Sequence, residues 1–145
     1  MIRTGSGHLR LALLGLALFV AGCGPKGIRY PETGASLEGT VTYGNDQVGA
    51  ALVIAQNDTG AATAFVDDDG KYRLQNVPLG EVNIAVNTAA GKGQAMGKAM
   101  AQSQGKAKGA PKLIDVPSRF ADPATSGIKT TINKGENTYD IVIPR

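Results

Sequence analysis

The 145-residue sequence has no tryptophan, one histidine (His8) and one cysteine (Cys23). A single cysteine excludes a disulfide within the chain. The absence of tryptophan disfavours a sugar site built on large aromatic platforms. No apolar run is long enough to cross a membrane as a helix, because the run Leu11–Val20 has ten residues where about 20 are needed. The sequence therefore indicates neither a disulfide-stapled domain nor a membrane-spanning helix.

The N-terminal 22 residues have the layout of a secretory signal peptide. A basic start with Arg3 and Arg10 precedes the apolar run, and small residues follow it. This order of basic, apolar and small residues is typical of a segment that is cleaved after export. Since His8 leaves with residues 1–22, the mature chain is expected to contain no imidazole.

The residues at the end of this segment resemble a bacterial lipobox, formed here by Val20, Ala21 and Gly22 before Cys23. The resemblance implies that Cys23 becomes the first mature residue and carries at least two acyl chains, such as palmitate. Two such chains are what stable membrane anchoring requires. The residue that follows is Gly24 and not aspartate, which by the same resemblance favours an outer over an inner membrane. The alternative is a free cysteine near an ordinary cleavage site.

With the signal peptide removed and Cys23 acylated, the mature protein has neither histidine nor a free thiol. This excludes Ser-His-Asp and Cys-His catalysis, histidine or thiolate zinc sites, and the commonest haem and iron–sulfur ligands. We therefore expect no enzyme activity and no cofactor. The mature chain has 123 residues, enough for one domain. It carries 13 basic and 12 acidic residues, so its formal charge is about +1 and gives no case for specific nucleic acid binding.

Turn residues divide the mature chain into a tether and a series of short strands. Residues 23–34 contain two prolines and several glycines and are predicted to be a flexible tether. Seven strands are predicted, over residues 37–43, 50–55, 61–66, 71–75, 81–87, 128–132 and 139–143. The strand 81–87 directs Val82, Ile84 and Val86 inward, with Ala85 among the outward residues. Without a convincing helix, residues 35–145 are expected to form an all-β, seven-stranded sandwich.

Two details of these strands are also predicted. The third and fourth strands are expected to form a hairpin around Asp67-Asp68-Asp69-Gly70, with Gly70 adopting positive φ. A second turn is expected over residues 134–137, just before the last strand.

Four segments carry a family resemblance by their order and spacing: Val41-Thr42-Tyr43, residues 49–53, residues 69–74 and Val77-Pro78-Leu79-Gly80. They resemble carboxypeptidase regulatory-like domains, which are transthyretin-like (prealbumin-like) sandwiches, over about residues 36–88. Residues 117–143 are similar to the C-terminal part of small bacterial lipoproteins that contain such a domain. The resemblance implies a Greek-key β-sandwich of seven strands and a place in the cell envelope. No catalytic residue follows from it.

Residues 88–112 interrupt the strand pattern with alanine, glycine and lysine and contain no acidic residue. Their five lysines are candidate contacts for a polyanion: Lys92, Lys98, Lys106, Lys108 and Lys112. A basic residue near an anionic surface contributes about 1 kcal/mol. The alternative, which we favour, is a flexible, solvated insertion, because several glycines oppose an amphipathic helix.

Three further groups of residues have a functional and a structural interpretation. Asp67, Asp68 and Asp69 hint at calcium, but adjacent aspartates do not converge as a calcium site requires. Asn57-Asp58-Thr59 matches a glycosylation acceptor in form alone. Ser126 with Lys129 has the spacing of a nucleophile and base, although a hydroxyl that caps a turn is the better interpretation. We expect no metal site.

These observations favour a non-enzymatic, lipid-anchored cell-envelope protein that binds or supports another envelope macromolecule. A small-ligand or carbohydrate-binding module is the alternative, which a surface cluster of Tyr30, Tyr43, Phe120 or Tyr139 would favour. A hydrolase is a remote third interpretation. It needs a pair of carboxylates such as Asp115 and Asp122 to converge in a cleft.

Overall fold

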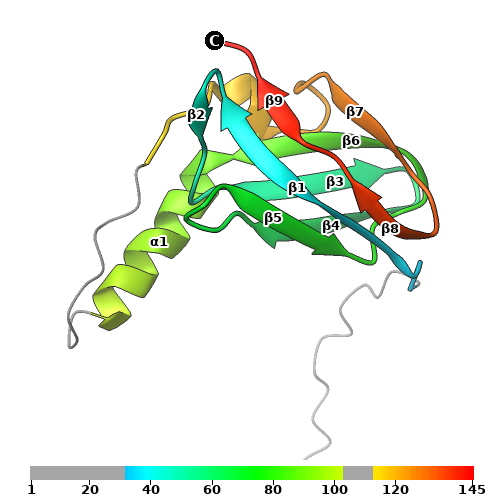
Figure 1. Ribbon diagram of the computed structural model, residues 1–145, viewed down its shortest axis with the longest axis horizontal. Helices are drawn as coiled ribbons and strands as arrows, with labels where there is room; N and C mark the ends of the chain where they lie inside the picture. The colour runs from blue at the N-terminus through cyan, green and yellow to red at the C-terminus, as the bar shows by residue number, and fades with distance from the viewer. Residues whose placement is uncertain (1–31, 103–112) are drawn as a thin grey trace, which may run out of the picture.

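The computed structural model of the protein describes residues 32–102 and 113–145, and Figure 1 shows their arrangement. Two β-sheets pack face to face, with one α-helix leaving the end of the sandwich and one short 3-10 helix near its rim (Figure 1). The expected all-β sandwich is thus confirmed at the level of its architecture.

The first sheet is organised around β1 (Ala35–Tyr43). On one side β1 pairs antiparallel with β2 (Asp46–Gln47) and β5 (Lys71–Gln75). On the other side it pairs parallel with β8 (Gly135–Thr138) and β9 (Ile141–Ile143). The first long strand of the domain therefore lies next to its last strands, which no hairpin can produce.

The second sheet has the order β4-β3-β6-β7 and is antiparallel throughout. Its strands are β3 (Leu52–Asn57), β4 (Gly60–Phe65), β6 (Gly80–Asn87) and β7 (Ile128–Ile132). A tight turn at Asp58-Thr59 joins β3 to β4, where the Asn57 side chain accepts hydrogen bonds from the Thr59 N–H and hydroxyl. These bonds give Asn57 a structural role in the turn.

The predicted hairpin between residues 61–66 and 71–75 is wrong, because β4 and β5 belong to different sheets. The Asp67–Gly70 turn exists, and Gly70 has φ +74° as expected. It carries the chain from the second sheet to the first rather than folding one strand back on the other. Asp67 Oδ1 accepts hydrogen bonds from the N–H groups of Asp69 and Lys71, which fixes this corner.

The core lies between the two sheets and follows the period-two alternation of the strands. Leu37 and Val41 of β1 face Val82, Ile84 and Val86 of β6, and all five are buried. Burying a side chain of this size contributes about 1.5–3 kcal/mol of transfer free energy.

The outer side of the second sheet differs from what the sequence predicts. Ala85 was expected to point to solvent but is fully buried, next to its cross-strand partner Ile54. The segment 50–55 was expected to be buried on both faces, but Leu52 and Ile54 are half-buried. The second sheet thus has one fully buried face and one partly covered face.

The structure has nine strands in its described residues instead of seven. One addition is the two-residue strand β2. The other is β8, which occupies residues predicted to form a turn before a single last strand. Tyr139 and Asp140 separate β8 from β9, although both strands keep the same register with β1.

A 15-residue helix, α1 (Thr88–Gln102), begins directly after β6, so the expectation of an all-flexible insertion without a helix is wrong for these residues. Asn87 caps the helix, since its side-chain oxygen accepts a hydrogen bond from the N–H of Ala90 at 2.9 Å. Alanines offset the glycines of this segment, because alanine is the best helix former and glycine costs about 1 kcal/mol relative to it. The first turn packs on the sandwich at Gly91, which lies against Ala50 and Ala51.

The segment after residue 112 leads into the 3-10 helix η1 (Ser118–Ala121). Phe120 of η1 is buried in the main core. The following turn is held by Thr125, whose hydroxyl donates to the Arg119 carbonyl at 2.6 Å, and by Asp122, which accepts from the Ala124 N–H at 2.8 Å. This segment closes the rim of the sandwich before β7 begins.

Candidate functional site

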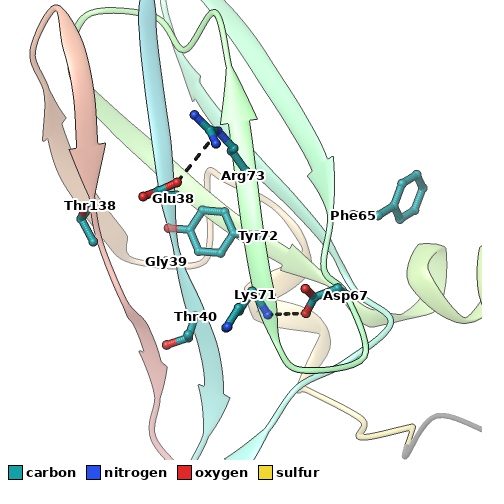
Figure 2. Close-up of a pocket in the computed structure, with 9 residues that line it drawn as sticks. All are labelled: Glu38, Gly39, Thr40, Phe65, Asp67, Lys71, Tyr72, Arg73 and Thr138. Atoms are coloured by element: carbon teal, nitrogen blue, oxygen red, sulfur yellow. Dashed lines mark hydrogen bonds and ion pairs between the residues drawn. The ribbon is translucent and has the colours of Figure 1, made fainter.

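A shallow groove of about 550 Å³ lies over the first sheet (Figure 2). Its lining comes from β1, β5 and β8 together with the end of β4 and the following turn: Glu38, Gly39, Thr40, Phe65, Asp67, Lys71, Tyr72, Arg73 and Thr138. In Figure 2 the Phe65 ring points away from the other labelled side chains. The groove is an open surface feature whose walls are more apolar than polar, although four charged residues line it.

Two of the charged side chains that line the groove, Arg73 and Glu38, are paired with each other. The Arg73 guanidinium lies 3.9 Å from Glu38 and 3.9 Å from Glu136, and all three side chains are more than half exposed. Exposed ion pairs of this kind contribute about 0–1 kcal/mol and are screened by salt. Because both signs of charge are present, the groove favours neither an anion nor a cation.

Tyr72 is the one buried residue among those that line the groove. Its hydroxyl donates a hydrogen bond to the Tyr139 carbonyl oxygen at 2.6 Å, and its ring is almost fully buried. Asp140 accepts hydrogen bonds from the N–H and the hydroxyl of Thr40, both at 2.8 Å. The Tyr139 N–H also donates to the Glu38 carbonyl at 2.9 Å. The side-chain bonds of Tyr72 and Asp140 therefore add to a backbone bond in holding residues 139–140 against β1 between β8 and β9.

The surroundings shift the pKa values of both groups. Burial, then the charge of Asp140 and finally Tyr139 raise the pKa of Tyr72 above its ordinary value of 10.0. The hydrogen bonds from the Thr40 hydroxyl and N–H hold the pKa of Asp140 below its ordinary value of 3.8. Neither shift poises a group for acid–base catalysis near neutral pH.

The raised pKa of Tyr72 predicts an alkaline instability. The folded protein keeps this phenol neutral while the unfolded chain ionises it, so its contribution to stability is complete below pH 10.0 and is lost as pH rises toward the folded pKa. We expect the Tyr72 phenolate to appear only as the protein unfolds. A spectrophotometric titration of the tyrosines beside a circular dichroism titration measures this, and Tyr72→Phe should remove the coupled phase. Ionisation of every tyrosine with the fold intact would contradict it.

A second groove, of about 620 Å³, lies between the start of β7 and the strand β9. It includes Phe120, Ile128, Tyr139 and Val142, with Arg119 and Lys129 at its rim. The Arg119 guanidinium lies 4.5 Å from the centre of the Phe120 ring, and Lys129 donates to Glu81 at 2.9 Å. The surface of this groove is more polar than apolar, and it carries two cations.

Ser126 borders the second groove but is engaged in the turn. Its Oγ accepts a hydrogen bond from the N–H of Ile128 at 3.3 Å, as the turn-capping interpretation predicts. Lys129, the base in the alternative interpretation, points its ammonium at Glu81. The two residues therefore have separate structural partners.

The two carboxylates of the hydrolase interpretation lie on opposite sides of η1 in the sequence and have unrelated partners. Asp115 forms an ion pair with Lys92 of α1, and Asp122 caps the turn after η1. Neither lines either groove. The structure thus gives each of them a local structural role.

The aromatic residues that were considered for a sugar platform are divided among different places. Phe120 and Tyr139 border the second groove, where Phe120 is buried and Tyr139 half-buried. Tyr43 lies under the Arg145 guanidinium, which is 5.4 Å from its ring centre. Tyr30 lies outside the described residues.

Helix α1 contains two of the five candidate lysines, Lys92 and Lys98. Lys92 is bound to Asp115, and Lys98 is exposed. Lys106, Lys108 and Lys112 lie outside the described residues. Two methionines that the sequence analysis did not single out, Met96 and Met100, are exposed by 62% and 76% on this helix. Their spacing of four residues indicates a shared helix face only where a helix is already known to form.

The residues of the proposed anchor, Val20, Ala21, Gly22 and Cys23, lie outside the described residues, as does all of the signal peptide and most of the tether. In the part of the chain that is described, no helix has the length and apolar character to span a membrane. Across residues 32–102 and 113–145, no three acidic, histidine or cysteine side chains gather where they could hold a metal ion, and Asp67 serves the β4–β5 turn.

Comparison with known proteins adds no family to these observations. No protein-family model matches the chain, and no curated protein matches it.

Proposed function

We propose that this protein is a lipid-anchored, non-enzymatic module of the cell envelope that binds another envelope macromolecule through helix α1. The support for the anchor is the segment Val20-Ala21-Gly22-Cys23 at the end of an apolar run. By its resemblance to bacterial lipoproteins, Cys23 would carry the lipid, with the outer membrane as the favoured site. The sandwich would then extend from that membrane on residues 23–34.

The observation that carries the binding proposal is the exposed surface of α1. The first turn of α1 packs on the sandwich, and the helix then leaves the end of the two sheets (Figure 1). Met96 and Met100, one turn apart, are exposed. Methionine is flexible and polarisable, and exposed methionines are common on surfaces that bind partner proteins. The helix also contains Lys98 and no acidic residue. An envelope protein with an apolar groove and acidic rim would fit this surface in the manner of a helix in a groove.

We also propose that the sandwich is a Greek-key, transthyretin-like domain. The support is the resemblance of about residues 36–88 to carboxypeptidase regulatory-like domains, together with the two-sheet architecture. In this proposal α1 and the segment after it are an insertion between two strands of the sandwich.

The binding proposal is tested by photo-crosslinking in intact cells. A photoreactive residue at Met96 or Met100 of the full-length protein is expected to capture one reproducible envelope component. The same residue at Gln75, an exposed position at the end of β5, is the control and should not capture it. The Cys23→Ser variant is expected to leave the membrane fraction and to lose the crosslink. Capture at Gln75 alone, or at none of the three positions, would refute a role for α1.

A small-ligand module is the second candidate function. The observation in its favour is the groove between β7 and β9, where Phe120, Tyr139 and Val142 lie beside Arg119 and Lys129. A small ligand with several hydrogen-bonding groups and a negative charge would fit these walls. Deletion of residues 89–112 separates the two candidates, because it removes α1 and keeps the groove residues in the chain.

A further inference from the structure

The strand β4 is an edge of the second sheet and pairs, in the described part of the chain, only with β3. In an antiparallel ladder, alternate residues direct both backbone groups toward the partner strand. The Val66 N–H donates to the Ala51 carbonyl at 2.8 Å, which shows that the backbone groups of Val66 point toward β3. Ala64 and Ala62 lie two and four residues before Val66, so their backbone groups also point toward β3. Ala61, Thr63 and Phe65 therefore direct their N–H and C=O groups away from the sheet.

The composition of β4 sets it apart from the other longer edge strands. Its sequence, Gly-Ala-Ala-Thr-Ala-Phe, has no charge and no proline. By contrast, β5 has Lys71 and Arg73, β7 has Lys129 and β8 has Glu136. Charged residues and prolines are the usual protection of a sheet edge against pairing with another chain. The edge of β4 lacks this protection along its whole length.

Acidic residues stand at both ends of β4. Asp58 precedes the strand, and Asp67, Asp68 and Asp69 follow it, all of them exposed. If a second copy paired antiparallel about Thr63, Asp58 would lie opposite Asp68 of that copy. Like charges in this position oppose pairing, as flanking charges do in natural strands that are protected from self-association. The same charges attract a strand with basic ends.

We propose that β4 is a docking edge for an extended segment of another polypeptide that is uncharged over about six residues and has lysine or arginine at both ends. The backbone groups of Ala61, Thr63 and Phe65 would bond to it as an added strand. The Phe65 ring, 42% exposed, would pack against a side chain of the incoming strand. This proposal rests on the second sheet alone and is independent of the anchor and of α1.

The proposal is tested with two synthetic peptides and the full-length protein in detergent micelles. Both peptides have a six-residue core of alternating threonine and valine, one with two lysines at each end and the other with two glutamates. Fluorescence anisotropy of labelled peptide is expected to show about tenfold tighter binding of the lysine peptide at low salt, a difference that shrinks as salt is added. Equal binding of the two peptides, or no binding, would overturn the proposal.

Variants of β4 locate the binding. Thr63→Pro removes an outward N–H and keeps the bonds to β3, so it should reduce binding by about tenfold or more. Thr63→Lys separates a loss of binding from a folding defect, because it should weaken binding of the lysine peptide and strengthen binding of the glutamate peptide. Thr63→Ala should change the binding of neither peptide. Asp58→Asn with Asp68→Asn should reduce the preference for lysine. Binding that ignores Thr63, or self-association of the free protein that Thr63→Lys abolishes, would contradict the assignment.

Discussion

Replacement of Gly39 by alanine is expected to lower the free energy of unfolding by about 3 kcal/mol or more, at the upper end of the range for overpacked sites. A Cβ atom at this position would lie 2.0 Å from the Tyr139 carbonyl oxygen and 2.7 Å from its carbon. Both are backbone atoms and cannot rotate away. Either β1 or the segment between β8 and β9 would have to move, which would break the bonds of Tyr72 and Asp140 described above.

The matched control for Gly39→Ala is Glu38→Ala on the same strand. Glu38 lies on the other face of β1 and loses only an exposed ion pair with Arg73, so its effect should stay below about 1 kcal/mol. Chemical denaturation monitored by circular dichroism measures both variants. A Gly39→Ala protein as stable as Glu38→Ala would show that the 139–140 segment does not lie against β1 as described.

The second large effect is expected in α1, where one chemical change should have opposite results two residues apart. A Cβ at Gly91 would lie 1.8 Å from the Ala50 carbonyl oxygen, so Gly91→Ala should detach the first turn of the helix and destabilise the protein by about 1–3 kcal/mol. A Cβ at Gly93 meets no atom within 4 Å. Gly93→Ala should therefore stabilise the helix by about 0.5–1 kcal/mol.

Thermal unfolding and the helical circular dichroism signal test this pair together. Gly91→Ala should lower both the midpoint and the helical signal, and Gly93→Ala should leave the signal intact or raise it. Changes of the same sign in the two variants would mean that contact with Ala50 does not position α1.

The sequence was a good guide to the strands because their signal is local. In β1 and β6 the large buried residues lie at alternate positions, with the small Ala85 as an additional buried residue, and the sheet faces follow from that pattern. It was a poor guide to pairing. The turn at Asp67–Gly70 has the residues of a hairpin, but only the position of β1 decides that β5 leaves the second sheet to join the first.

The helix was missed for a related reason. The low helix propensity of glycine disfavours a helix here, whereas two features favour it: the cap at Asn87 and the contact of Gly91 with Ala50. The second of these is a tertiary contact that no local pattern contains. The bonds of Tyr72 to Tyr139 and of Thr40 to Asp140 join residues 67 and 100 positions apart, so they were equally out of reach.

The central place of β1 has a mechanical consequence. The chain enters the domain at Ala35, and the first residues of β1 are bonded on both sides, to Arg73–Gln75 of β5 and to residues 135–138 of β8. Interstrand hydrogen bonds run across the strand axis, so tension along β1 loads both ladders in shear, and they must fail together rather than one bond at a time. A pull on the N-terminal side is therefore resisted by the strand with the most neighbours in the first sheet, and the sandwich is built to bear load at the end where the proposed tether attaches.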